Sequence, residues 1–278
     1  MRSGQRRSGQ RQSTAGARRR TSVWTLRLLT FGLVMALWFL LTELEVWSPL
    51  ILPRPSSVWE AFVQSVTTDG RRRGLGGYFL WEHLRASLWR ILNGVFWAII
   101  LGIAVGFLLG SSWRIRTMLE PLVSFLRSLP PLAYFTILIF WFGIQDTSKI
   151  WLLFLAAFPP ITLATMNGIE RVRTDRVDAA RSLGGSRLQL IRHVVLPSAL
   201  PDIFTGIRVA TGFALTTIVA AETVNGLPGI GGLAWFTKKD TRIDVAILCV
   251  IVIGLTAILL DQLIQLCERA FVPWKGHA

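Results

Sequence analysis

Six long apolar runs constrain this chain more than any other feature of its sequence. A helix needs about 20 mostly apolar residues to cross the ~30 Å hydrocarbon layer of a bilayer. The chain is 52% hydrophobic and only 17% charged, too apolar for an ordinary soluble domain. The runs cover residues 28–41, 91–109, 122–142, 150–166, 203–221 and 245–266. The sequence therefore predicts an all-α membrane protein with six transmembrane helices.

The first run is short and follows a basic tail. It reaches spanning length only if it extends through Val46 and Trp47. The tail has no acidic residue among its arginines, which are Arg2, Arg6, Arg7, Arg11, Arg18, Arg19 and Arg20. Such a cluster could bind nucleic-acid phosphates, but a basic cytosolic tail beside a span already accounts for it, and we expect no nucleic-acid partner. No small-residue cleavage site follows Leu41, so we expect the first helix to be retained.

The charges between the runs agree with cytosolic termini. With six spans and a cytosolic amino terminus, the long segment 170–202 and the carboxyl terminus also lie in the cytosol. Six arginines crowd that segment, whereas Lys149 and Lys238 fall in shorter outer loops. Residues 71–73 disagree, but they lie in a long first outer loop, where charge constrains topology less.

Two proline pairs and one acid stand out within the runs. Pro130-Pro131 and Pro159-Pro160 interrupt neighbouring runs. A proline inside a helix costs ~3 kcal/mol, so other helices or water must satisfy the freed carbonyls. A translocation pathway or an ordinary kink would both explain them. Glu222 precedes the glycine-rich stretch 226–232, and an acid at membrane depth is a functional candidate. Pro130, Pro131 and Glu222 are therefore candidate pathway or gate residues.

The segment 175–197 is predicted to form two short helices with a hinge. Asp175 and Asp178 suit the positive start of the first helix, and Gly184-Gly185 supplies a left-handed end. Ser186 and Gln189 have capping-box spacing for the second helix, which we expect Leu196-Pro197 to close. A connection with this much order indicates a docking surface for another protein. A solvated hairpin without a partner is the alternative.

The same segment carries a family resemblance. The pattern Glu-Ala-Ala, three residues, Gly, nine residues, Ile-x-Leu-Pro is typical of permease subunits of binding-protein-dependent ABC importers. Here it reads Asp178-Ala179-Ala180, Gly184, Val194 and Leu196-Pro197, with Asp in place of Glu and Val in place of Ile. The resemblance runs from about Leu52 to Gly276. Further matching motifs are Glu120-Pro121-Leu122, Leu129-Pro130-Pro131-Leu132, Trp141-Phe142-Gly143 and Ala221-Glu222.

The resemblance implies a type I ABC importer permease fold in a bacterial inner membrane. It implies a homodimer, two cytosolic ATPase subunits and one external solute-binding protein. The helix around Ala179 to Gly184 would be the coupling helix. The expected coupling residues are Asp178, Ala179, Ala180, Leu183, Gly184, Val194, Leu196 and Pro197. The chain looks most like permeases for nitrate, aliphatic sulfonates and taurine, and its ending Val272–Gly276 resembles the taurine branch. The expected substrate is a small anion, taurine or another sulfonate, with nitrate or another small solute as the alternative.

Four segments follow from these expectations. Residues 1–27 form a basic cytosolic tail, and residues 28–90 form the first transmembrane helix and an outer loop. Residues 91–268 form the permease core, with the cytosolic coupling loop at 170–202. Residues 269–278 form a cytosolic carboxyl-terminal tail.

The chain is not expected to be an enzyme or to hold a cofactor. It lacks the G-x-x-x-x-G-K-[ST] phosphate loop, so ATP would be bound by the partner ATPase. No histidine or carboxylate pair has metal-ligand spacing. Cys249 and Cys267 would lie roughly 27 Å apart on one helix, too far for a disulfide. A secondary carrier is the rival class, but it would need acids near the midplane, whereas most acids here lie at the rims of the runs. An intramembrane enzyme would need a nucleophile and base that the sequence does not place together.

Overall fold

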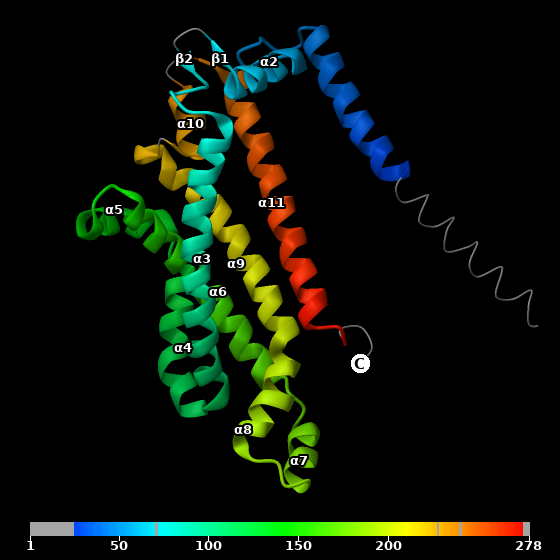
Figure 1. The fold of residues 1–278 in the computed structure, drawn as a ribbon, viewed down its shortest axis with the longest axis vertical. Helices are drawn as coiled ribbons and strands as arrows, with labels where there is room; N and C mark the ends of the chain where they lie inside the picture. Colours follow the sequence, from blue (N-terminus) through cyan, green and yellow to red (C-terminus); the bar gives the residue numbers. More distant parts are fainter. Residues whose placement is uncertain (1–24, 70–71, 227, 239–240, 275–278) are drawn as a thin grey trace, which may run out of the picture. The chain divides into compact units, whose positions relative to one another are not determined.

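The computed structural model describes residues 25–69, 72–226, 228–238 and 241–274 (Figure 1). The chain divides into two compact units at Ala61. A helix at Thr25–Glu43 belongs to the first unit, and α2 (Pro55–Val66) crosses the division. The second unit contains a short antiparallel pair, β1 (Thr68–Asp69) and β2 (Arg72–Arg73). Its helices are α3 (Leu80–Ser111), α4 (Trp113–Ser128), α5 (Pro131–Phe142), α6 (Asp146–Glu170), α7 (Thr174–Ser182), α8 (Arg187–Leu190), the π-helical turn η1 (Ile191–Val195), α9 (Leu196–Asn225), α10 (Ile230–Phe236) and α11 (Ile243–Phe271).

The predicted spans are present as helices. Five helices are long and apolar enough to cross a membrane, and the pair α4–α5 passes the same test as a broken span bent by 96°. The first span is placed differently from the expectation. It gains length on its amino-terminal side, from Thr25, and ends at Glu43 instead of extending through Trp47. Glu45 has a positive φ of 49°, a conformation that an α-helix does not use.

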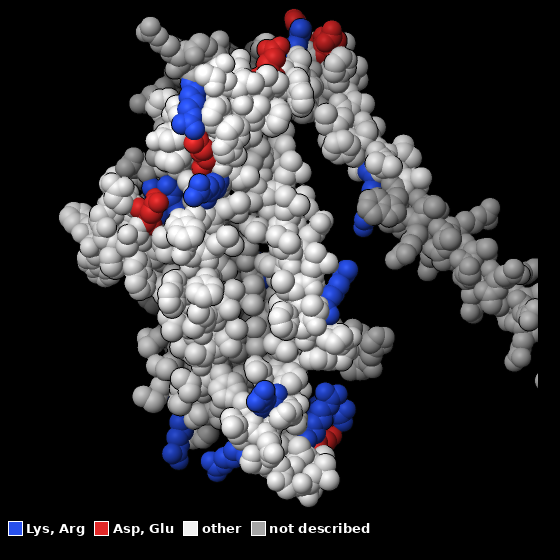
Figure 2. All heavy atoms as spheres, viewed as in Figure 1, with Lys and Arg blue, Asp and Glu red and all other residues white. Residues whose placement is uncertain are grey.

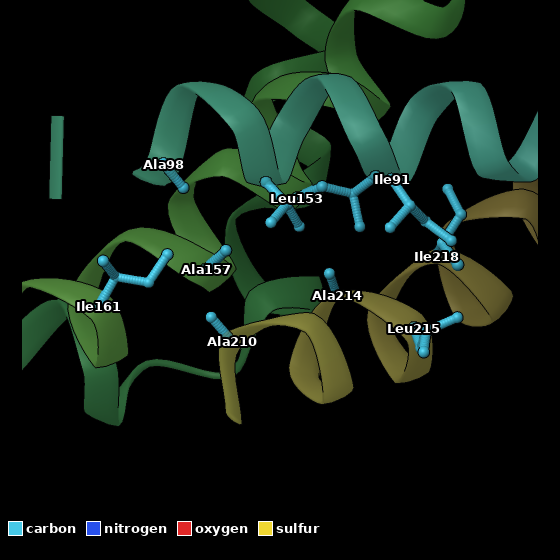
Figure 3. Close-up of a cluster of buried hydrophobic side chains, with 10 residues drawn as sticks. Ile91, Ala98, Leu153, Ala157, Ile161, Ala210, Ala214, Leu215 and Ile218 are labelled. Atoms are coloured by element: carbon cyan, nitrogen blue, oxygen red, sulfur yellow. The ribbon is translucent and has the colours of Figure 1, made fainter. Parts of the chain in front are cut away.

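The core of the second unit lies among α3, α6 and α9 (Figure 3). Its buried side chains come from all three helices: Ile91, Val95, Ala98, Leu153, Ala157, Ile161, Ala210, Ala214, Leu215 and Ile218. Small residues recur every four positions along α3: Gly94, Ala98, Gly102, Gly106 and Gly110. A Cβ added at Gly106 would lie 2.5 Å from the carbonyl oxygen of Thr162. This small-residue face lets α6 approach the α3 backbone closely.

The two proline pairs have different structural consequences. Pro130 caps α5 and Pro131 is its first residue, so this pair breaks the span and separates α4 from α5. A proline is tolerated at a first helical position because its missing N–H would have no intrahelical acceptor there. Pro159 and Pro160 lie inside α6, which continues through them to Glu170.

Two predictions from the sequence were wrong: the end of the second hairpin helix and the location of Lys149. Leu196-Pro197 does not close the second hairpin helix, because α8, η1 and α9 form one continuous helix from Arg187 to Val224. In η1 the N–H of Leu196 donates to the carbonyl of Ile191, five residues back, so the helix widens just before Pro197. A π turn of this kind lets a helix pass a residue that cannot donate a regular hydrogen bond. Lys149, expected in a loop, lies inside α6 and is 2% exposed.

Ion pairs tie the outer helices to the core. Arg208 of α9 forms a two-bond pair with Asp261 of α11, with N–O distances of 2.7 and 3.2 Å. Gln265 also donates to Asp261 at 2.6 Å. Arg116 near the start of α4 pairs with both Glu120 and Glu170. Two of these pairs, Arg208–Asp261 and Arg116–Glu170, join different helices, whereas Arg116–Glu120 lies within α4.

Candidate functional site: an ordered hairpin and a buried ion cluster

The hairpin formed by residues 174–190 projects at one end of the second unit, opposite α10 (Figure 1). Its first helix, α7, ends as the glycines predict. Gly184 has a φ of +79°, in the left-handed region that favours glycine. The N–H of Gly184 donates to Arg181 at 2.8 Å and that of Gly185 donates to Ala180 at 3.1 Å. These bonds satisfy the last carbonyls of α7 and turn the chain back.

The second hairpin helix begins with the predicted capping box. The N–H of Ser186 donates to the Gln189 side chain at 2.8 Å, and the N–H of Gln189 donates to Ser186 Oγ at 3.4 Å. Both ends of the hinge are therefore fixed by local hydrogen bonds. The hairpin is an ordered surface and does not depend on burial, since none of the α7 residues is buried.

A groove of about 390 Å³ lies in this hairpin. It is lined by Ala180, Leu183, Gly184, Gly185, Gln189, Leu190, His193 and Val194. Four of the predicted coupling residues are thus brought together, and Leu183 stands 89% exposed at the groove. Arginine side chains gather at the same end in Figure 2. The groove therefore exposes an apolar side chain at a basic end of the second unit.

The other predicted coupling residues lie around the groove. Asp178 pairs with Arg181 at 3.4 Å, and Ala179 beside it is exposed. Leu196 and Pro197 form the first turn of α9, outside the groove lining. They fix the direction in which the hairpin leaves the long helix.

Glu222 lies at the opposite end of α9 and is 1% exposed. Arg90 Nη1 donates to Glu222 Oε1 at 2.6 Å. Ser87 Oγ lies 2.8 and 2.9 Å from the two carboxylate oxygens. The N–H of Gly231 donates to Glu222 Oε2 at 2.9 Å. One carboxylate therefore joins α9 to α3 and to the start of α10.

The glycine-rich stretch before α10 is held by the same face of α3. Ser87 Oγ accepts from the N–H of Ile230 at 3.0 Å. His83, fully buried, accepts at Nδ1 from the N–H of Gly229 at 3.0 Å, and its Nε2 donates to the carbonyl of Leu75 at 3.0 Å. The turn leaves no room for larger residues, since a Cβ at Gly231 would lie 2.4 Å from the Val219 carbonyl oxygen.

Arg90 extends this cluster towards α6. Its Nε donates to Asp146 at 2.8 Å, while the guanidinium itself is only 4% exposed. The ammonium of Lys149 is close enough to be repelled by Arg90 and attracted by Asp146 and Glu222. Arg90, Lys149 and Glu222 are buried at this site, whereas the side chain of Asp146 is 52% exposed. The buried carboxylate of Glu222 is therefore paired, as a buried charge must be.

Pro130 and Pro131 act on this region through α5. The bend that they introduce brings Phe135 and Leu138 into an apolar cluster with Leu152 and Ala221. Ala221 directly precedes Glu222. Pro130 and Pro131 therefore do not contact Glu222 in this cluster. They are linked to it through α5, whose side chains pack against Ala221.

Ser87, Arg90, Asp146 and His83 were not predicted from the sequence as site residues, and Lys149 was expected only as a loop charge. A signal for three of them was present, because His83, Ser87 and Arg90 are spaced by four and three residues in α3. That spacing places them on one face. Within the described ranges, no three His, Cys, Asp or Glu side chains could together hold a metal ion.

These features define a polytopic helical membrane protein with an ordered hairpin at one end and a buried polar clamp at the other. The chain belongs to the family of binding-protein-dependent transport system inner membrane components, whose model matches residues 98–274. It is therefore a multi-pass permease subunit of a binding-protein-dependent ABC importer, in which ATP hydrolysis occurs on a separate subunit. This membership removes the secondary-carrier alternative.

Two curated relatives and one solved structure illustrate the similarity. The chain is 37% identical to the taurine transport system permease protein TauC of Escherichia coli (strain K12), over 91% of this chain and 90% of the relative. It is 35% identical to the putative aliphatic sulfonates transport permease protein SsuC of the same organism, over 91% and 94% of the two chains. A chain of the MetNI methionine ABC transporter, in an inward-facing conformation, shares the fold with a TM-score of 0.55 at 20% identity, covering 67% of this chain and 96% of that one.

Proposed function

We propose that this chain forms the translocation pathway for a small anionic solute, a sulfonate such as taurine, and is coupled to its ATPase through residues 175–197. The groove in the hairpin is the main observation that supports the coupling role. It assembles Ala180, Leu183, Gly184 and Val194 on a surface that the chain itself leaves uncovered. The taurine and sulfonate relatives support the substrate class.

The functional complex in this proposal contains two permease copies, two cytosolic ATPases and one external solute-binding protein. The hairpin end faces the cytosol, as do both termini, and the α10 end faces outward. The membrane is a bacterial inner membrane. This chain holds no cofactor, because ATP is bound by the partner subunits.

The hairpin suits mechanical coupling because it is rigid and continuous with a span. Hydrogen bonds fix its hinge, and α8 joins η1 and α9 in one helix of 38 residues. Movement of a docked ATPase would therefore displace α9 as a unit. Glu222 lies near the other end of that helix, so we assign the clamp of Glu222, with the bend at Pro130 and Pro131, to an outer gate.

Nitrate or another small anion is the alternative substrate. The sulfonate group and nitrate each carry one delocalised negative charge, but taurine also carries an ammonium group that nitrate lacks. Competition between taurine and nitrate for uptake by the intact system distinguishes them.

The coupling role is tested with Leu183→Glu. This side chain is 89% exposed, so the substitution leaves internal packing intact, but a carboxylate in the groove opposes docking of an apolar partner surface. We expect ATPase co-purification and uptake to be lost while the permease still inserts into the membrane. Leu50→Glu, at another exposed leucine, is the matched control and should retain the ATPase. Normal co-purification and uptake with Leu183→Glu would overturn the coupling role.

A further inference from the structure

An open groove runs along the face of α3 that carries Trp81, Arg85 and Trp89. These residues are spaced four apart, and all three are exposed. The upper part of the groove has a volume of about 720 Å³ and is lined by α3 together with Tyr78 and Pro228. The lower part, about 570 Å³, continues between α3, α9 and α11 and shares Trp89 and Leu92 with the upper part.

The chemistry of the groove changes along its length. Arg85 lies in the upper part, and it makes no hydrogen bond or ion pair with any residue that the structure describes. The nearby Glu82 carboxylate is engaged elsewhere, with Arg73 and with the N–H of Phe79. The lower part is almost wholly apolar, with side chains such as Phe96, Ile99 and Leu263. A cation at one end and hydrocarbon at the other complement an anionic amphiphile.

Membrane depth places the cation at headgroup level. The 32 residues of α3 extend roughly 48 Å, which exceeds the ~30 Å hydrocarbon layer by about 9 Å at each end if the helix is centred. About six residues from Leu80 onward then lie at the interface, where Trp81 and Arg85 fall. From Trp89 to Ile99 the helix descends roughly 15 Å, the depth of one leaflet.

The lower groove has a volume of about 570 Å³ and is lined almost entirely by hydrocarbon side chains. Such a surface fits an acyl chain, and Arg85 in the upper part fits the phosphate of the same molecule. We propose that this groove is a binding site for an anionic phospholipid, with its phosphate on Arg85 between Trp81 and Trp89 and an acyl chain along Leu92, Phe96 and Ile99.

The test measures phosphatidylglycerol binding to the full-length chain by native mass spectrometry. Arg85→Gln removes the cation and should weaken phosphatidylglycerol binding about five-fold. Arg114→Gln removes an equally exposed arginine that has no ion pair in the described part of the chain, and it should leave binding unchanged. Leu92→Trp keeps Arg85 but fills the groove, and it should also weaken binding. Binding at the wild-type level in both Arg85→Gln and Leu92→Trp would overturn the proposal.

A second measurement asks whether a protein segment fills the groove instead. The helix Thr25–Glu43 is apolar and only 6% buried, so it is the competing occupant. Phe96→Cys is combined with single cysteines along that helix, in a background in which the exposed Cys267 is replaced by Ser. No cross-link is expected. Disulfide formation in high yield would show that the helix occupies the groove and would overturn the lipid site.

Discussion

The Glu222 carboxylate receives hydrogen bonds from Ser87, Arg90 and Gly231, which lie on two different elements. It is 1% exposed, so none of these bonds can be replaced by bulk water. A buried charge is tolerated only when such partners surround it, and removing one partner strands the other. Sequence position alone suggested a functional acid at the rim of a span. The structure shows that the residue also holds α9, α3 and α10 together.

Glu222→Gln is expected to destabilise the protein by about 3 kcal/mol. The amide offers one acceptor oxygen where three donors converge, and its NH₂ group faces the N–H of Gly231 or the guanidinium of Arg90. Thermal unfolding of the purified permease measures the loss. Asp175→Asn, in an exposed pair with Arg173, is the matched control and should change stability by less than about 1 kcal/mol. Equal unfolding temperatures for the two variants would contradict the clamp.

The small-residue face of α3 decides how closely two spans pack. Gly102 and Gly106 have α6 atoms where a side chain would begin, at 2.9 Å from Ile161 and 2.5 Å from the Thr162 carbonyl oxygen. In a membrane, helices gain little from hiding apolar surface, so close backbone approach supplies much of the attraction between them. Glycine is therefore needed at these positions for packing, not for backbone freedom.

Gly106→Ala is expected to cost about 1–3 kcal/mol by overpacking the α3–α6 contact. Gly254→Ala in α11 provides the control, because an added Cβ there meets nothing within 4 Å. That control should be neutral or stabilise slightly, since alanine has the better helix propensity. Urea or thermal unfolding in the same detergent compares the two. If Gly106→Ala unfolds at the same urea concentration or temperature as Gly254→Ala, close packing of α3 on α6 does not contribute to stability.

At the scale of the whole second unit, the long helix from Arg187 to Val224 links the hairpin with the Glu222 clamp. The α9 residues of the core cluster, Ala210 to Ile218, lie along this helix between its two ends. Arginines gather at the hairpin end (Figure 2). The proposed orientation, with the hairpin in the cytosol, follows the positive-inside rule.

Cysteine labelling tests this orientation. In a Cys267→Ser background expressed without the ATPase, which would cover Leu183, Leu183→Cys is expected to react with a membrane-impermeant maleimide only after the cells are opened. Trp235→Cys, on α10 and 53% exposed, should react in intact cells. Cys249 is buried and should stay unlabelled in both preparations. Labelling of Leu183→Cys in intact cells would reverse the proposed orientation.

The local features of this fold followed from the sequence, and the contacts between distant elements did not. Apolar run length predicted the spans, because the bilayer sets the length of a helix that crosses it. Gly184 and the Ser186–Gln189 box predicted the hairpin hinge, because capping involves residues only a few positions apart. The coupling role of that hairpin stays a prediction.

The tertiary structure decided which charges meet. Arg90 and Glu222 are 132 residues apart, and Arg208 and Asp261 are 53 apart, so nothing local links them. The effect of the two proline pairs could not be predicted from the sequence either. Pro130-Pro131 breaks its span whereas Pro159-Pro160 does not, although both pairs remove backbone donors. Whether a helix continues through such a pair depends on the helices packed around it, and α6 shares a core with α3 and α9 along the turns that contain its prolines.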